Sequence, residues 1–388
     1  MIKRDAAKLL KVYLKTFPVV LIVGPRQCGK TTLARECLKG WKFFDLEKSS
    51  DYEAISFDLE SFLDANVSAT AIDEAQRLPE LFPALRVAVD KGRRPGRYVL
   101  TGSASPSLLK AAGESLAGRL GVLELTPFGA SEVKHLPAGL ENRWFFGGYP
   151  PVYHLKSARQ KSEWLEAYVA AFIEKDIPAL GFKIPPQRIR KFLYMLSNVH
   201  GGILNVIGLA RSMEISQHTA EYYLDLLEGA FIIRRLQPYY ANIGKRLVKS
   251  PKVYLRDSGL FNYFSGLRAK SELDYFARRG TSWEGLVVEE AARRAALKYT
   301  RPGIFYWRTQ AGAEVDLILE NGLEKTAIEV KLGKTVKSAS LLGLKSCMAD
   351  LKIKSASVIY SGTERVELGG GIKLLPWAHF CADSNAYL

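Results

Sequence analysis

The first 149 residues alternate short apolar runs with segments of helical periodicity. A short apolar run bounded by turn-forming residues is typical of a strand that is buried on both faces. Five such runs occur here: VVLIVG (19–24), WKFFDLE (41–47), SATAIDEA (68–75), GRYVLTGS (96–103) and GVLELTPF (121–128). Strands that alternate with helices predict a parallel sheet with helices on its faces.

The pattern changes near residue 150. The segment GGYPPV (147–152) combines glycine and proline, which stops regular structure and suits a domain junction. Helical periodicity runs from 160 to about 230, followed by two strand candidates; beyond 281 come a long helix, three strands, a helix and two more strands. We therefore predict an α/β chain of three domains, at 1–149, 150–256 and 257–388.

Composition adds a partner class to this picture. The 388 residues include 55 Lys and Arg against 40 Asp and Glu, a formal charge of +15. Such an excess favours polyanions, with nucleic acid as the first candidate and anionic membrane as the rival. No apolar run is long enough to span a membrane and the start lacks the features of a signal peptide, so we expect a cytoplasmic protein. Its four cysteines, without close pairs, indicate reduced thiols.

The string GPRQCGKT (24–31) matches the phosphate-loop pattern and stands between a predicted strand and a predicted helix. The backbone N–H groups of such a loop converge on phosphate oxygens at a helix amino terminus. Lys30 is expected to reach the outer phosphates, and the Thr31 hydroxyl to ligate Mg²⁺. The predicted ATP-binding residues of the loop are Gly24, Pro25, Arg26, Gln27, Cys28, Gly29, Lys30, Thr31 and Thr32. Cys28 is either a redox-sensitive thiol or a small residue that fills space.

An acidic pair and two hydroxyl residues follow later strands of the same sheet. Asp73 is suited to orient the Mg²⁺ shell and Glu74 to polarise the attacking water. Thr101 and Ser103 end the next strand, where either could sense the terminal phosphate or simply form a loop. The prediction is an ATPase site at the carboxyl edge of the sheet.

The middle segment, between about 188 and 255, resembles a winged helix-turn-helix in the string that runs from 190 to 236. Its first helix would lie within LNVIGLARSM and its second within QHTAEYYLDLLEGA, with Ser216 as the N-cap between them. The following basic residues are predicted to contact nucleic acid: Lys245, Arg246, Lys249 and Lys252. Acidic residues on the second helix favour a packing or oligomerisation role for it over sequence reading.

Near the carboxyl end, Asn321-Gly322 predicts a two-residue hairpin turn. Pairing outward from that turn puts Glu314 opposite Glu329 and Asp316 opposite Ala327. By the period-two rule Glu314, Asp316, Glu329 and Lys331 share one face, while Val315, Leu317, Ile328 and Val330 share the other. Carboxylates that face one another repel unless a cation offsets them, which indicates a Mg²⁺ or Mn²⁺ site. An ordinary solvated surface is the alternative.

Element order and these residues carry three resemblances. The helix, strands and the residues Glu284, Asp316, Glu329 and Lys331 resemble the PD-(D/E)XK nuclease superfamily, which implies a divalent ion held by the three carboxylates and a lysine near the attacking water. Arg119, directly before the fifth strand, resembles the arginine finger of AAA+ ATPases; the alternative is an exposed arginine at a helix end. No second sensor arginine is recognisable.

The third resemblance covers almost the whole chain. GPRQCGKT, AIDEA, SLAGR, KSPKVYLRDSGL, EVD and IEVK together resemble the prokaryotic AAA-type ATP-binding proteins with a carboxyl-terminal domain of unknown function. This implies an ATPase core using ATP and Mg²⁺, a winged-helix segment and a nuclease-like module. We expect an oligomeric enzyme, in a ring or partial ring, that processes or remodels DNA, including branched or damaged DNA. The rival is a nucleotide-dependent switch that binds a protein partner or promoter, with the nuclease-like fold inactive.

Overall fold

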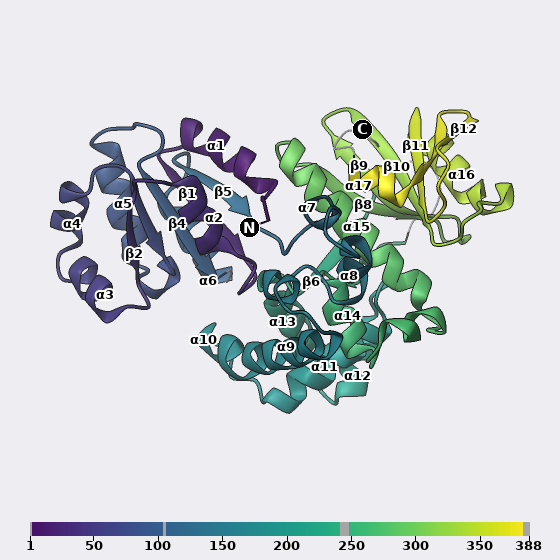
Figure 1. Ribbon diagram of the computed structural model, residues 1–388, viewed down its shortest axis with the longest axis horizontal. Helices are drawn as coiled ribbons and strands as arrows, with labels where there is room; N and C mark the ends of the chain where they lie inside the picture. The colour runs from purple at the N-terminus through teal and green to yellow at the C-terminus, as the bar shows by residue number, and fades with distance from the viewer. Residues whose placement is uncertain (1, 104–105, 241–247, 383–388) are drawn as a thin grey trace. The chain divides into compact units, whose positions relative to one another are not determined.

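The computed structural model describes residues 2–103, 106–240 and 248–382 (Figure 1). These residues form two compact units. The first unit comprises Met1–Phe128, Tyr149–Pro151 and Asp225–Phe231, and the second comprises Gly129–Gly148, Val152–Leu224 and Ile232–Leu388. Each unit is described by itself. The predicted division into three domains stays a prediction.

The first unit contains a five-stranded parallel sheet with the strand order β2-β3-β4-β1-β5. Its strands are β1 (Val19–Gly24), β2 (Lys42–Asp45), β3 (Thr70–Asp73), β4 (Tyr98–Ser103) and β5 (Leu120–Glu124). All six residues of β1 are buried, as a central strand covered on both faces requires. The parallel sheet that the apolar runs predicted is confirmed.

Helices follow most strands of this unit, and their apolar residues complete its core. The helices are α1 (Ala6–Thr16), α2 (Lys30–Cys37), α3 (Ser49–Ser56), α4 (Leu59–Ala65), the 3₁₀ turn η1 (Ala75–Arg77), α5 (Leu81–Asp90) and α6 (Pro106–Ser115). Leu81, Leu85 and Val89 lie along one face of α5 and are fully buried against the sheet core. Because every strand is parallel, the carboxyl ends of β1, β3 and β4 meet at one edge of the sheet.

The second unit contains an eight-stranded mixed sheet, with the order β12-β13-β11-β10-β9-β8-β6-β7. Its strands are β6 (Ile233–Pro238), β7 (Lys252–Leu255), β8 (Gly303–Arg308), β9 (Glu314–Asn321), β10 (Glu324–Lys331), β11 (Ser355–Tyr360), β12 (Val366–Gly369) and β13 (Ile372–Pro376). Strand β6 pairs in parallel with β8 and antiparallel with β7. One sheet therefore includes strands from both sides of the boundary predicted at residues 256 and 257.

Helices of the second unit fall into two groups. The first group is α7 (Ala130–Val133), α8 (Gly139–Phe145), the 3₁₀ turn η2 (Pro150–Tyr153), α9 (Ala158–Ala171), the π-helical turn η3 (Phe172–Asp176), α10 (Ile177–Ala179), α11 (Pro186–Asn198), α12 (Val206–Met213) and α13 (Gln217–Gly229). The second is α14 (Ser258–Phe264), η4 (Lys270–Asp274), α15 (Arg279–Lys298), η5 (Ser338–Leu341), α16 (Leu342–Leu351) and α17 (Trp377–Ala382). Pro150 and Pro151 of η2, and the last residues of α13, are grouped with the first unit.

The elements α11, α12, α13, β6 and β7 follow one another in the order predicted for the middle segment. The Ser216 hydroxyl accepts a hydrogen bond from the Thr219 amide (3.0 Å), which confirms Ser216 as the cap of the second helix. An isolated antiparallel bridge joins Ile203 to Lys252. The winged-helix classification of this segment stays a prediction.

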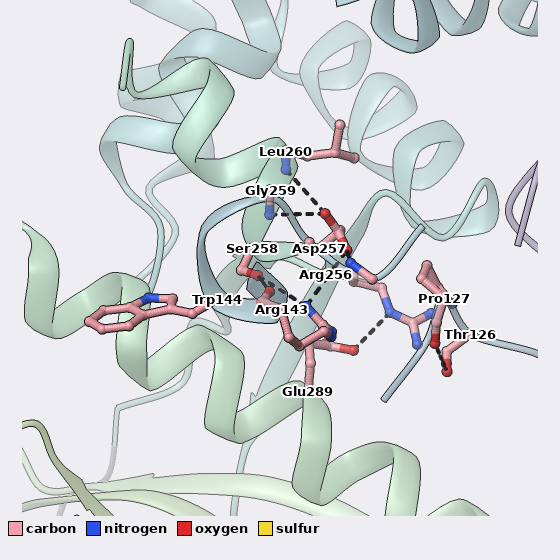
Figure 2. A network of polar contacts seen from close by, with 12 residues as sticks. Thr126, Pro127, Arg143, Trp144, Arg256, Asp257, Ser258, Gly259, Leu260 and Glu289 are labelled. Carbon is pink, nitrogen blue, oxygen red and sulfur yellow. Dashed lines mark hydrogen bonds and ion pairs between the residues drawn. The ribbon is translucent and has the colours of Figure 1, made fainter. Parts of the chain in front are cut away.

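Asp257 fastens the amino terminus of α14 (Figure 2). Its carboxylate accepts hydrogen bonds from the amides of Gly259 (2.9 Å) and Leu260 (3.2 Å), and from the amide of Gly148 (2.8 Å). Arg143 Nη1 lies 3.8 Å from Asp257 Oδ2. Burial raises the pKa of this carboxyl, against the opposing effects of Arg143 and the three amides. The carboxylate thus links the end of β7 to the segment after α8.

The hairpin between β9 and β10 differs from its predicted register. Asn321 pairs with Glu324 and Ile318 with Ala327, so the turn residues are Gly322 and Leu323 rather than Asn321 and Gly322. Only Gly322 of this turn has a positive φ (61°), which suits a turn with glycine at its first central position. The prediction that Asp316 lies opposite Ala327 and Glu314 opposite Glu329 is therefore wrong by two residues.

A slip of two residues preserves which side chains share a face. Leu317, Ile328 and Val330 accordingly pack in one core cluster. Val315 lies in a different cluster, because the pairing with β8 shifts between Trp307–Val315 and Phe305–Ile318. This bulge in β9 lies next to Asp316, and because of it the prediction that Val315 shares a face with Leu317, Ile328 and Val330 is wrong for Val315.

Candidate functional site

The phosphate loop connects β1 to α2. Gly29 caps α2 with a φ of 96°, a conformation that favours glycine. At Gly24 a side chain has no room, because a Cβ atom would lie 2.1 Å from the carbonyl oxygen of Leu125. Both glycines of the motif are thus required by the backbone itself. The loop leads directly into the amino terminus of a helix, the arrangement that binds phosphate.

Lys30 lies inside this loop. Its side chain is buried, and Nζ donates hydrogen bonds to the carbonyl oxygens of Gly24 (3.1 Å) and Pro25 (3.0 Å). These bonds hold the ammonium group at the loop rather than in solvent. A buried ammonium with only carbonyl partners is suited to bind an anion.

Asp73, the last residue of β3, joins three elements. Thr31 Oγ1 donates a hydrogen bond to Asp73 Oδ2 (2.7 Å), and the hydroxyl of Thr101 on β4 donates to Asp73 Oδ1. Burial raises the pKa of this carboxyl, against the lowering effect of the Thr31 hydrogen bond, and the Glu74 charge raises it further. The structure therefore brings Thr31 and Asp73 together, which are the two residues predicted to orient Mg²⁺.

Glu74 follows in the left-handed conformation (φ 55°). Its Oε2 accepts a hydrogen bond from Gln76 Nε2, and the Ser103 hydroxyl lies 3.5 Å away. Ser103 and Thr101 end β4 as predicted, and each contacts one of the two acidic residues. The side chain of Gln76 holds the Glu74 carboxylate in place, a role for which the sequence shows no recognisable signal.

The remaining loop residues differ in their exposure. Arg26, Gln27 and Thr32 are exposed, and Arg26 lies 4.0 Å from Glu47 in an ion pair on the surface. Cys28 is fully buried, and burial raises the pKa of its thiol. A buried thiol of raised pKa is poorly reactive, which favours the space-filling interpretation over the redox one.

Arg4 is a part of this site that motif reasoning missed. It precedes α1, is buried, and donates hydrogen bonds to the carbonyl oxygens of Cys28 (2.7 Å) and Thr126 (2.5 Å). Its guanidinium also lies 4.8 Å from the centre of the Phe128 ring. One cation thereby connects the phosphate loop to the segment after β5. A lone arginine 24 residues before the contact gives no sequence signal.

Arg119 lies at the opposite edge of the sheet. Its carbonyl accepts a hydrogen bond from Val19, the first residue of β1, whereas the phosphate loop follows the last. A strand of six residues separates them, about 20 Å at the usual rise per residue. The guanidinium is held by Asp90 through two bonds, of 2.8 and 2.7 Å. Within one chain Arg119 cannot reach the phosphate loop.

In the second unit, two of the three acidic residues predicted to bind a metal, Glu284 and Asp316, lie beside a lysine. Nζ of Lys252 lies 3.0 Å from Glu284, 2.5 Å from Glu314 and 3.7 Å from Asp316. Tyr254 donates a hydrogen bond to Glu284 (2.5 Å). Burial and the Asp316 charge raise the pKa of Glu284 to about 7, although Lys252 lowers it. Glu314 was predicted on this carboxylate face, whereas Tyr254 and Lys252 were not among the predicted members of the cluster.

Glu329 and Lys331 form the other half of the cluster. Lys331 donates a hydrogen bond to Glu329 Oε1, while Glu329 Oε2 is buried without a hydrogen-bond partner. Burial and the Asp316 charge raise the pKa of Glu329 to about 8, against the effect of Lys331. Asp316 Oδ2 accepts a hydrogen bond from the Val330 amide (2.8 Å).

These side chains do not fit a divalent ion as they are placed. In the part of the chain that the structure describes, no three His, Cys, Asp or Glu side chains are grouped so that they could hold a metal ion. The ammonium of Lys252 lies 3.0 Å from Glu284 and 3.7 Å from Asp316, two of the three carboxylates that the metal would need. The sequence predicted the acidic residues, but not the cation among them.

The basic segment before β7 is only partly described. Lys245 and Arg246 lie outside the described residues, and Lys249 is exposed. Lys252 is 2% exposed and ion-paired, so the prediction that it projects from a basic surface toward nucleic acid is wrong. The physical reason is the charge of Glu284 and Glu314, which stabilises the ammonium inside the unit. Among the described residues, no helix is long and apolar enough to cross a membrane.

Comparison with known proteins places these sites in a family. Residues 16–134 match the model of an AAA domain, residues 138–271 match a domain of unknown function (DUF8612), and residues 279–380 match another (DUF4143). The uncharacterized protein Rv2008c of Mycobacterium tuberculosis is 38% identical over 381 residues, covering 96% of this chain and 83% of that protein. The chain belongs to the same family as this protein. The uncharacterized protein Mb2031c of Mycobacterium bovis matches with the same values.

The matches to the domain models confirm part of the resemblance drawn from the motifs. The amino-terminal part is an AAA-type P-loop domain, and the carboxyl-terminal part is a domain of unknown function. Among solved structures, the Walker-type ATPase paby2304 of Pyrococcus abyssi matches with a TM-score of 0.49 and 15% identity, over 68% of this chain and 96% of that protein. A likeness at this level adds nothing to the assignment. The winged-helix and nuclease-like assignments stay predictions.

Proposed function

We propose that this family member binds ATP with Mg²⁺ at the carboxyl edge of the parallel sheet and hydrolyses it. The observation that carries the proposal is the contact of Thr31 with Asp73 (2.7 Å), which joins the phosphate loop to the end of β3. A hydroxyl and a carboxylate from these two elements are the pair that ligates and orients Mg²⁺ in P-loop ATPases. When bound there, Mg²⁺ supplies positive charge that offsets the charge of the phosphates.

Each neighbouring side chain has a definite task in this proposal. Lys30 binds the outer phosphates, and the loop amides bind the others. Glu74 orients and polarises the attacking water, and Gln76 positions the Glu74 carboxylate through its hydrogen bond. Thr101 fixes the orientation of Asp73. Ser103, which lies beside Glu74, is placed to respond to the terminal phosphate.

ATP turnover by the purified full chain tests the proposal. We expect release of phosphate that requires Mg²⁺ and that Asp73→Asn reduces by at least about a hundredfold, since the metal loses its orienting carboxylate. Glu53→Gln, an exposed change on α3, is the matched control and should leave the rate unchanged. An Asp73→Asn chain that is folded and as active as the wild type contradicts the proposal.

DNA is the partner that we propose for this ATPase, within a homo-oligomer. The net charge of +15 supports a polyanionic partner, and Lys249 is an exposed basic residue of the segment before β7. In the rival function, the chain is a nucleotide-dependent switch that binds a protein or a promoter. The rival function also holds that the carboxyl-terminal domain is structural and inactive. The burial of Lys252 favours this point, because the lysine is not available to contact DNA.

A panel of single-stranded, duplex and branched DNA distinguishes these functions. A DNA-processing enzyme should hydrolyse ATP several times faster with one of these DNAs, and the stimulation should fall as salt rises, because phosphate contacts release counterions. A switch should hydrolyse ATP slowly at a rate that DNA does not change. Lys249→Ala should weaken the stimulation if the segment before β7 contacts DNA.

A further inference from the structure

Lys252 lies where the resemblance to nucleases implies a divalent ion. Three carboxylates face its ammonium group, with nitrogen–oxygen distances of 3.0 Å to Glu284, 2.5 Å to Glu314 and 3.7 Å to Asp316. The side chain of Lys252 is 3% exposed, so the carboxylates rather than solvent neutralise the charge of its ammonium group. A buried ammonium among carboxylates is stable only when all of these partners stay in place.

The position of Lys252 is fixed by the backbone. It is the first residue of β7, pairs with Leu236 of β6, and forms a second bridge with Ile203. Tyr254, two residues further along β7, lies on the same face and donates its hydroxyl to the carboxylate of Glu284. The ring of Tyr306 lies 5.7 Å from the ammonium. Strand pairing and burial thus hold the lysine among the carboxylates.

The charges and lone pairs of the cluster are largely used by the protein itself. Glu314 also pairs with Arg308 (2.9 Å), and Glu329 pairs with Lys331. One oxygen of Asp316 accepts a hydrogen bond from the Val330 amide, and the other faces Lys252. A divalent ion at this place would be repelled by an ammonium group within a few ångströms. The carboxylates can accept such an ion only if Lys252 leaves.

We infer that Lys252 is the resident cation of this carboxylate cluster, in place of a divalent metal ion, and that the carboxyl-terminal domain does not cut nucleic acid by metal-dependent chemistry. Lys252 neutralises Glu284 and Glu314 as an ion would, but it offers no open position for water or a phosphate oxygen. The acidic residues then stabilise the join between β7, α15 and β9. This inference is independent of ATP hydrolysis, which belongs to the other unit.

Titration of the nucleotide-free full chain with Mn²⁺ tests the inference. Asp73→Asn is included in every variant, so that the P-loop site contributes no heat. With Lys252 intact we expect no Mn²⁺ binding. Lys252→Ala should bind Mn²⁺ with an affinity at least about tenfold above the weakest that the titration detects, the size of effect that neighbours of metal ligands usually have. Adding Asp316→Asn should remove that gain, and Lys183→Ala, the exposed control, should produce none.

Two results would overturn the inference. One is that the chain with Lys252 intact binds Mn²⁺, or cleaves DNA in an Mn²⁺-dependent way, and that Glu329→Gln abolishes this binding or cleavage. The other is a folded Lys252→Ala chain that binds no Mn²⁺, because the cluster then has no place for a cation. If Lys252→Ala unfolds, refolding of that variant by Mn²⁺ supports the inference. If Mn²⁺ does not refold it, the titration and cleavage assays with Lys252 intact decide.

Discussion

Arg4 and Glu289 are charged side chains that lie inside the units, and each is held by partners from distant parts of the chain. Arg4 binds the carbonyl oxygens of Cys28 and Thr126 in the first unit. Glu289 of α15 accepts hydrogen bonds from Arg234 and, in Figure 2, from Arg256 in the second. Buried charges of this kind are costly to leave unpaired, so single substitutions at them have large effects.

Arg4→Ala should weaken nucleotide binding by roughly tenfold or more, since hydrogen bonds to charged groups contribute about 1.5–3 kcal/mol each. The expected cause is a less ordered phosphate loop, because Arg4 positions the loop through Cys28. The nucleotide affinity of Arg4→Lys should lie between those of the wild type and Arg4→Ala, because an ammonium group cannot donate in two directions as the guanidinium does. Titration with a fluorescent nucleotide measures the effect, and the exposed Lys3→Ala is the control. Equal affinity in Arg4→Ala and wild type contradicts this role.

Glu289 predicts an acid-sensitive contribution to stability. Burial raises the pKa of its carboxyl, but Arg234 and Arg256 outweigh burial and lower it to about 2. Because the folded-state pKa lies below the unfolded value, the stabilisation is complete above about pH 4.5 and is lost as pH falls toward 2. Glu289→Gln should lower the free energy of unfolding by about 3 kcal/mol at pH 7, and by much less near pH 2.

Urea unfolding at both pH values measures this difference. Glu367→Gln, on the exposed edge strand β12, is the matched control and should leave stability unchanged at either pH. A Glu289→Gln penalty that stays the same at pH 7 and near pH 2 would show that packing, rather than charge, accounts for the role of this residue.

At the scale of elements, the parallel arrangement of β1, β3 and β4 assembles the ATP site. Their carboxyl ends present Lys30, Asp73, Glu74 and Ser103 at one edge of the sheet. In the proposed function the loop after β1 binds phosphate and the end of β3 acts on water, so substitutions in the two elements should have different effects. This difference separates nucleotide binding from hydrolysis.

Lys30→Ala should abolish nucleotide binding, because the loop loses the cation that faces the outer phosphates. Glu74→Gln should bind ATP normally and hydrolyse it at least about a hundredfold more slowly, because an amide cannot act as the base for water. Calorimetric binding and phosphate release measure the two effects, with the exposed Glu80→Gln as control. Equal turnover by Glu74→Gln and wild type would remove Glu74 from the catalytic role.

At the scale of the whole molecule, we propose that Arg119 connects the proposed activity to assembly. It lies at the sheet edge opposite the phosphate loop and is paired with Asp90. An arginine so placed can act only on the nucleotide of a second copy, which is how the resemblance to AAA+ ATPases interprets it. The alternative is a structural ion pair on the surface of one chain.

Arg119→Ala should bind ATP normally but hydrolyse it at least roughly a hundredfold more slowly, the low end of an arginine finger's contribution. Mixing it with Lys30→Ala should restore part of the turnover, since mixed assemblies join an intact site to an intact finger. Asp90→Asn is the matched control: it breaks the ion pair but keeps the arginine, so it should remain active. This role is contradicted if Arg119→Ala and Asp90→Asn lose the same fraction of the ATP hydrolysis rate. It is also contradicted if a strict monomer hydrolyses ATP at a rate that does not depend on protein concentration.

Local patterns in the sequence determined much of the first unit. VVLIVG forms the interior strand β1, and GPRQCGKT forms the loop and the start of α2. Asp73 ends β3 and Glu74 follows it, as predicted. These features depend on contiguous residues, whose periodicity and glycine positions are visible in one short window. The sequence likewise determined which acidic residues gather in the second unit.

Only the tertiary structure decided which distant residues complete each site. Arg4 reaches the loop at Cys28, and Thr101 reaches Asp73, across separations that no local pattern encodes. A period of two cannot distinguish registers that differ by two residues, so the β9–β10 pairing needed the turn geometry. Lys252 stands in a basic stretch of sequence, yet Glu284 and Glu314 from other elements stabilise it inside the unit. The partners of a charge, which come from elsewhere in the fold, determine whether it is buried.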